Sequence, residues 1–110
     1  MRITVSHTKP KQEVIRAVDR SFDDLFRSIP MIPLQLVNER REWNGSTLTF
    51  SFDAKMGPVS TPIKGFVAVT DRDITIDADL GLLERLLPAK QTQTALEGRV
   101  RGLLKGSGEP

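Results

Sequence analysis

The feature that most constrains the fold is a pair of alternating segments at residues 63–70 and 73–80, joined by a two-residue connection at 71–72. If that connection is a turn, the apolar positions of the two segments face each other on one side: Ile63, Gly65, Val67 and Val69 lie opposite Leu80, Ala78, Ile76 and Ile74. On the other side Lys64 lies opposite Asp79, a favourable pair of opposite charges. Because both faces agree, the sequence predicts an antiparallel strand pair in this register.

Further strands and two helices are expected around this pair. Alternation predicts strands over residues 2–6, 34–43 and 47–53, with a hairpin turn at Asn44-Gly45 and a break at Met56-Gly57-Pro58. Apolar residues three and four positions apart predict helices over 10–29 and 88–105. We therefore predict an α+β fold in the order β-α-β-β-β-β-α, a single antiparallel sheet with two helices packed on one face. It would form one domain over residues 1–105, followed by a disordered tail at 106–110.

The segment 34–43 fits this sheet less well than the others. A two-residue turn at Asn44-Gly45 would place Glu39 and Arg41 on the same face as Phe50 and Leu48. A bulge, a three-residue loop or an edge position would each accommodate these charges. The sequence leaves all three alternatives open.

Composition excludes several classes of function. The 110 residues include no cysteine, so disulfides and thiolate metal sites are excluded, and the single histidine excludes a multi-histidine metal site. The net charge is only +2 and aromatic residues make up 5%, without a recognition motif, so we expect no nucleic-acid binding. No apolar run approaches the roughly 18 residues of a transmembrane helix and no secretory signal is visible, so a cytoplasmic location is expected.

A group of aspartates and the single histidine are candidates for a catalytic or metal site. Asp73, Asp77 and Asp79, with Asp53 on another strand, could gather carboxylates on the outer face of the sheet. We favour a solvated face on which Asp79 pairs with Lys64. Ser6 and Thr8 flank His7, but adjacent strand residues point to opposite faces, so an exposed or helix-entry role is favoured for the histidine. The sequence predicts no catalytic residues, no cofactor and no metal.

The stretch that follows the last strand is unusually rich in leucine and is followed by a basic segment. The candidate surface or partner-contact residues are Leu82, Leu83, Arg85, Leu86, Leu87, Arg99 and Arg101. Exposed leucines would form an apolar patch, and basic residues beside an apolar stripe are typical of an interfacial helix. Ordinary packing of this helix on the core is favoured over such a contact.

Three motifs together resemble one small bacterial family. They are W-x-G-x-x-L-x-F at residues 43–50, the alternation after Gly65, and Asp77-x-Asp79-Leu80-Gly81 followed by Pro88. The chain is similar here to the putative polyhydroxyalkanoic acid system proteins, also called the granule-region family. The resemblance runs from about Ile3 to Leu104. The connection over residues 54–62 is expected to be longer than in typical members of the family. It implies an association with polyester synthesis or with granule surfaces, and it supplies no catalytic residues.

These observations together predict a non-enzymatic accessory protein that binds the polyester granule surface or granule proteins. One alternative is a module of the helix-grip type that binds fatty acyl-like ligands, with a pocket lined by Phe50, Phe52, Phe66 and Met56. Another alternative is a homodimer formed through a sheet edge or through the leucine-rich turn.

Overall fold

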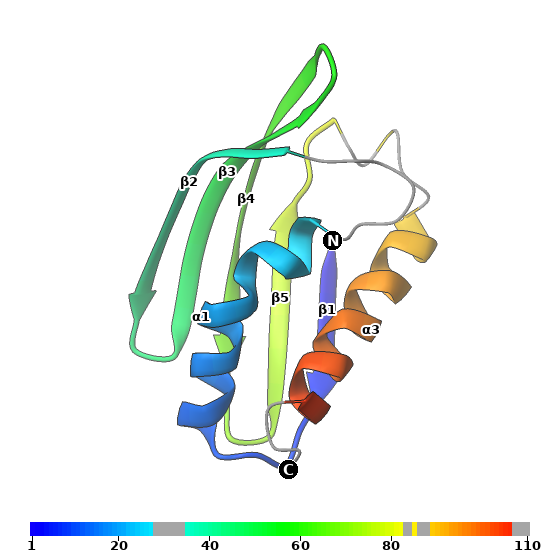
Figure 1. Cartoon of the computed structure of the whole chain (residues 1–110). Coiled ribbons are helices and arrows are strands. Elements are labelled where there is room, and N and C mark those ends of the chain that lie inside the picture. The colour runs from blue at the N-terminus through cyan, green and yellow to red at the C-terminus, as the bar shows by residue number, and fades with distance from the viewer. Residues whose placement is uncertain (28–34, 83–84, 86–88, 107–110) are drawn as a thin grey trace.

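A computed structural model describes residues 1–27, 35–82, 85 and 89–106 of the chain. The elements are β1 (Arg2–Ser6), α1 (Lys11–Arg27), β2 (Gln35–Asn44), β3 (Thr47–Met56), β4 (Val59–Val69), β5 (Asp73–Asp79) and α3 (Ala89–Gly106). The five strands form one antiparallel sheet in the order β1-β5-β4-β3-β2, with both helices on one of its faces (Figure 1). The predicted α+β fold and the order of its elements are confirmed.

The register of β4 against β5 is the one that the sequence predicts. Val69 lies opposite Ile74, Val67 opposite Ile76 and Gly65 opposite Ala78. The fit is especially close at Gly65, where a Cβ atom would lie only 2.0 Å from the carbonyl oxygen of Asp77. Glycine is therefore required at this position, because any side chain would push the two strands apart.

Strand β2 combines two of the alternatives that the sequence left open. It is an edge strand, and its register shifts between Val37 and Arg40, where Asn38 has a φ of 56°. This bulge changes which residues face the helices, so that half-buried Leu36 packs on the core. The predicted turn at Asn44-Gly45 is wrong by one residue, since Asn44 pairs with Thr47 and the turn residues are 45–46.

The hairpin of β3 and β4 is longer than the sequence predicts. Met56 pairs directly with Val59, so Gly57 and Pro58 form a two-residue turn rather than the end of the strands. The expectation of a long connection over residues 54–62 is therefore wrong. The pairing with β3 continues through Pro62, opposite Asp53. Proline is tolerated there because the pairing of β4 with β5 has already ended at Lys64, so β4 is an edge on that side. The tip of this hairpin projects beyond the rest of the sheet (Figure 1).

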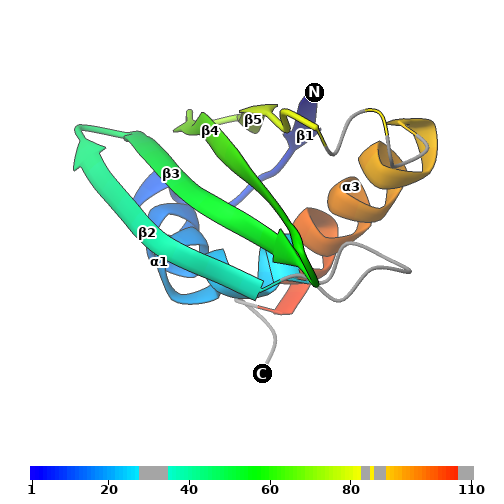
Figure 2. The ribbon, with the colours of Figure 1, turned by 90° about the horizontal axis from the view of Figure 1, so that it is seen from above.

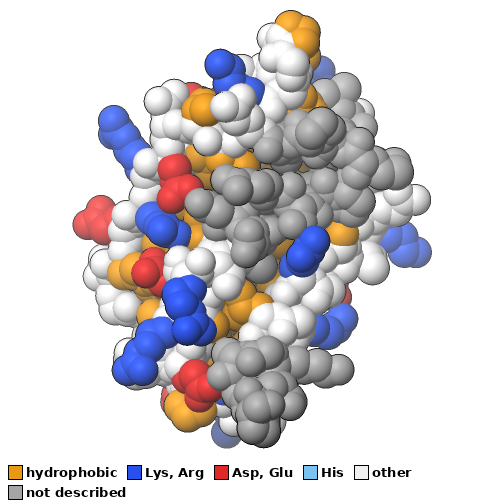
Figure 3. Space-filling view, in the orientation of Figure 1, with side chains coloured by type: hydrophobic (Ala, Val, Ile, Leu, Met, Phe, Trp, Pro, Cys, Tyr) orange, Lys and Arg blue, Asp and Glu red, His pale blue; other side chains and the backbone are white. Residues whose placement is uncertain are grey.

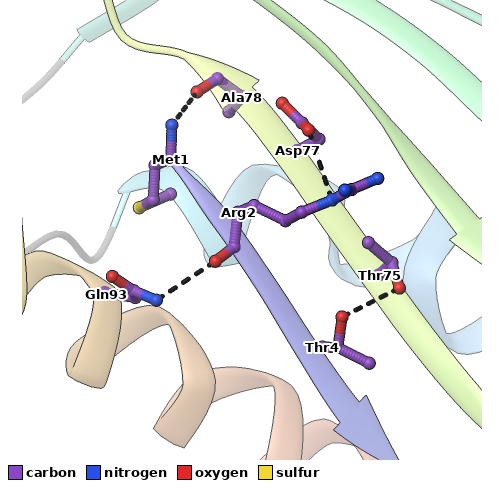
Figure 4. Close-up of polar contacts among 7 residues, drawn as sticks. All are labelled: Met1, Arg2, Thr4, Thr75, Asp77, Ala78 and Gln93. Carbon is purple, nitrogen blue, oxygen red and sulfur yellow. Dashed lines mark hydrogen bonds and ion pairs between the residues drawn. The ribbon is translucent and has the colours of Figure 1, made fainter.

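Strand β1 pairs with β5 along one side and forms a hydrogen bond with α3 along the other (Figure 4). The backbone amino group of Met1 donates to the carbonyl of Ala78 at 2.8 Å. On the outer face the Arg2 Nε lies 3.4 Å from the Asp77 carboxylate. The side-chain amide of Gln93 in α3 donates to the backbone carbonyl of Arg2 at 3.1 Å. This hydrogen bond gives a partner to one backbone group of the edge strand β1.

The hydrophobic core lies between the sheet and the two helices, and the sheet curls around α1 when it is seen from above (Figure 2). Helix α1 buries the stripe that the sequence predicts, with Val14, Val18 and Phe22 each fully buried. Helix α3 buries Leu96, Val100 and Leu104 against the β1 side of the core. It also buries Thr92, which the apolar pattern does not reveal.

Some sequence-based predictions fall on residues that the structure does not describe. The proline-rich connection at 30–33, Pro88 and the tail residues 107–110 lie outside the described ranges. Gly106 still belongs to α3, so the helix extends one residue beyond the boundary at which the tail was predicted to begin.

Candidate functional site

The end of β5 is held by one buried hydroxyl group. The side chain of Thr61 in β4 is buried, and its Oγ1 accepts a hydrogen bond from the backbone amide of Leu82 at 3.1 Å. The amide of Arg85 donates to the carbonyl of Leu82 at 3.1 Å, which places Leu82 and Arg85 in a single helical turn. Backbone contacts therefore fix the position of Leu82 and leave its side chain 48% exposed.

A second exposed hydrophobic residue lies on the same strand as Thr61. Val59, 36% exposed, is two residues before Thr61 and therefore on the same face of β4. Met56 is paired with Val59 and is half-buried against the core. Hydrophobic side chains are visible at this tip in the upper part of Figure 3.

We call this region the hairpin end and define it by Lys55, Met56, Val59, Leu82 and Arg85. Among the described residues, Val59 and Leu82 are the exposed large hydrophobic side chains of the protein. Lys55 and Arg85 are exposed and positively charged, and Lys55 projects from the face of the hairpin opposite to that of Val59. The structure thus places Leu82 and Arg85 of the predicted contact residues together; Leu83, Leu86 and Leu87 lie outside the described residues. Val59 is not among the predicted contact residues, because the sequence predicts a break in the strand at Met56-Gly57-Pro58.

Arg99 and Arg101 do not join this region or each other. Two residues apart on an α-helix, they point in directions that differ by about 200°, on opposite flanks of the buried stripe. Arg101 also pairs with Glu97 at 3.6 Å. The apolar stripe of α3 packs in the core, as the favoured interpretation expects, so the described side chains of the helix offer no apolar face to an external surface.

The four aspartates that could have formed a carboxylate site have separate local partners. They alternate along the outer face of β5, except for Asp53, which lies two strands away on β3. Their partners are Arg2 for Asp77, the Thr70 hydroxyl for Asp73, the Gly81 amide for Asp79 and the Asn38 amide group for Asp53. No group of three potential metal ligands occurs among the described residues.

Asp79 and Lys64 take the opposed positions that the sequence predicts, but their side chains form no ion pair in the described part of the chain. The Asp79 carboxylate instead caps the turn at Gly81 at 3.0 Å. Asp79 therefore helps to direct the chain toward Leu82.

His7 lies just before α1, as expected, and both of its ring nitrogens have backbone partners. Its Nδ1 accepts from the amide of Lys9 at 3.2 Å, and its Nε2 donates to the carbonyl of Thr70 at 2.9 Å. These contacts tie the start of the helix to the turn between β4 and β5. A structural role accounts for this histidine.

Aromatic side chains fill the space that an acyl-binding pocket would need. The ring of Phe22 in α1 meets those of Phe50 and Phe52 edge to face, with centroids 5.1 and 6.4 Å apart. Phe66 lies opposite Asp77 on the outer face of the sheet, so it cannot line a cavity with the other two. Its assignment to such a lining is therefore wrong.

None of the helices that the structure describes has the length and apolar character required to cross a membrane. Comparison of the chain with protein-family models, curated proteins and solved structures finds no match.

Proposed function

We propose that the protein is a non-enzymatic accessory protein of polyhydroxyalkanoate metabolism and that it binds the polyester surface through the hairpin end. The resemblance of residues 43–50, 65–69 and 77–81 to the granule-region family supplies the metabolic context. The surface of a polyester granule is apolar, and a protein that binds it must present apolar side chains that its own core leaves uncovered.

The observation that carries this proposal is the joint exposure of Val59 and Leu82 at one end of the molecule. Both side chains are held by ordered backbone, one on a strand of the hairpin and the other through the hydroxyl of Thr61. Binding would therefore cost little ordering entropy. Each exposed aliphatic side chain that becomes buried stabilises a complex by about 1 kcal/mol or more.

The basic residues contribute in a different way from the one that the sequence suggests. Lys55 and Arg85 lie at the hairpin end and would meet any anionic groups at the granule boundary, such as polymer chain-end carboxylates. Arg99 and Arg101 lie farther along α3 and are outside the proposed contact. The contact is thus a compact apolar tip with a cationic rim.

Sedimentation with amorphous polyhydroxybutyrate particles tests the proposal. We expect the wild-type protein to sediment with the particles and Leu82→Asp to lose about tenfold in affinity, because a charge replaces the most exposed leucine. Thr94→Asp is the matched control, since Thr94 is exposed on α3 and the substitution adds the same charge. It is expected to bind like the wild type.

Two outcomes would overturn the proposal. One is that the wild-type protein stays in the supernatant at every particle concentration. The other is that Leu82→Asp and Thr94→Asp bind equally well. Fractionation of cells that accumulate polyester gives an independent answer, because the absence of any granule-bound share would contradict a surface-binding role.

A further inference from the structure

The outer face of the sheet, away from both helices, contains a shallow hollow of about 380 Å³ over β2, β3 and β4. It is lined by Arg40, Arg41, Glu42, Thr49, Phe50, Ser51 and Lys64. The hollow forms because the short side chains of Thr49 and Ser51 stand between longer charged ones on the flanking strands. Its floor therefore carries hydroxyl groups and its rim carries charges.

The strand register aligns three of these residues in one row across the sheet. Arg40 is paired with Ser51 and Ser51 is paired with Lys64, so all three side chains project from the same face. With neighbouring strands about 4.8 Å apart, the Cα atoms of Arg40 and Lys64 lie roughly 10 Å from each other. Both cationic side chains can thus reach a group held above the Ser51 hydroxyl.

Neither cation of this row forms an ion pair with a described residue, although Asp79 lies opposite Lys64 on β5. Arg40 and Lys64 are both exposed. Arg41, the next residue along β2, is different: its guanidinium pairs with Glu39 at 3.4 Å and donates to the carbonyl of Asp19 at 3.1 Å on the helix side. Two unpaired like charges across one strand repel each other, and an anion between them would remove that repulsion.

We propose that this hollow binds a small oxyanion, a carboxylate or a phosphate group. Arg40 and Lys64 would contact it from the two sides, and the Ser51 hydroxyl would donate from below. Guanidinium and ammonium groups both form charge-assisted hydrogen bonds to such oxygens. Glu42, two residues from Arg40 on the same face, limits the affinity and disfavours ligands of high negative charge density. The site lies on the outer face of the sheet, and it does not depend on the proposed polyester contact.

A titration followed by amide ¹H–¹⁵N spectra tests this site, with inorganic phosphate in one arm and acetate in the other. We expect saturable shifts at the amides of residues 40–42, 49–51 and 64, and the tighter of the two probes identifies the class of anion. Lys64→Gln should weaken binding about five- to tenfold. Lys90→Gln is the matched control, because Lys90 is an exposed lysine on α3, outside both proposed contacts, and the substitution should leave binding unchanged.

A gain of affinity distinguishes the site from ordinary surface charge. Glu42→Gln removes the one carboxylate of the hollow and should strengthen binding about two- to threefold. The same spectra report whether each variant is folded. Linear shifts without saturation, or equal losses in Lys64→Gln and Lys90→Gln, would overturn the proposal.

Discussion

The indole Nε1 of Trp43 donates a hydrogen bond to the Asp19 carboxylate at 3.0 Å, and this contact joins the edge strand β2 to helix α1. Beside it, Arg41 donates to the backbone carbonyl of Asp19 and stacks over the ring of Phe22, with 5.2 Å between the guanidinium carbon and the ring centroid. The positive charge of Arg41, on the core-facing side of β2, is thus part of the contact between this strand and the helix.

Replacement of Asp19 tests this connection. Asp19→Ala removes the acceptor for Trp43, and we expect the free energy of unfolding to fall by about 1 kcal/mol. Amide exchange should become faster in β2 and stay unchanged in β5, because the helix no longer restrains the edge strand. Asp19→Asn keeps an acceptor and should remain within about 0.5 kcal/mol of the wild type in urea unfolding. Equal losses in the two variants would contradict this role.

Gly65 is expected to be the position at which the smallest substitution has a large effect. A methyl group there would lie 2.8 Å from the Cα atom of Ala78 and closer still to the Asp77 carbonyl. Gly65→Ala should therefore destabilise the protein by at least about 2 kcal/mol. Gly98 in α3 has no atom within 4 Å of the same added group, so Gly98→Ala should raise stability by roughly 0.5–1 kcal/mol. Thermal unfolding of the two variants should give shifts of opposite sign.

The hydroxyl of Thr61 should determine how firmly the hairpin end is held. Thr61→Val keeps the volume of the buried side chain and removes the acceptor for the Leu82 amide, which costs about 1–2 kcal/mol. We expect faster amide exchange at Leu82 and weaker binding to polyester particles. Thr61→Ser retains the hydroxyl and serves as the control for binding. Full binding by Thr61→Val would show that the order of this turn is irrelevant to the contact.

The bulge of β2 should depend on the residue at position 38. Asn38 has a φ of 56°, a region in which branched side chains are strained, and its side-chain amide donates to Asp53 at 2.9 Å. Asn38→Val should cost about 1–2 kcal/mol, whereas Asn38→Gly loses the hydrogen bond but fits the backbone and should be nearly neutral. Denaturant unfolding of the pair separates conformational strain from the lost contact, since equal costs would point to the hydrogen bond alone.

The sequence predicts the β4–β5 pair correctly because both faces of those strands are constrained at once. Apolar residues oppose one another on the inner side of the pair and polar residues on the outer side. A shift of the register by one residue would therefore expose all of the apolar side chains. Strand β2 has no such double constraint. Its bulge at Asn38 and its contacts with Asp19 depend on the position of α1, which no local pattern records.

The candidate site was predictable only in part for a similar reason. The leucine-rich stretch indicates that some hydrophobic side chain stays exposed, and Leu82 does. The burial of Leu96 and Val100 depends on whether β1 and α3 meet, which is a property of the tertiary structure. The row formed by Arg40, Ser51 and Lys64 depends on the register of three neighbouring strands. The sequence does not predict the register of β2, because its bulge shifts the pairing between Val37 and Arg40.

The placement of β1 has a consequence for biosynthesis. Its hydroxyl contact between Thr4 and Thr75 joins residues 71 positions apart, and its contact with Gln93 spans 91 positions. On the ribosome, the first strand must therefore wait for most of the chain before it finds either neighbour, while the consecutive hairpins from β2 to β5 can pair as they emerge. A nascent chain is therefore expected to close its sheet at the β1 side last.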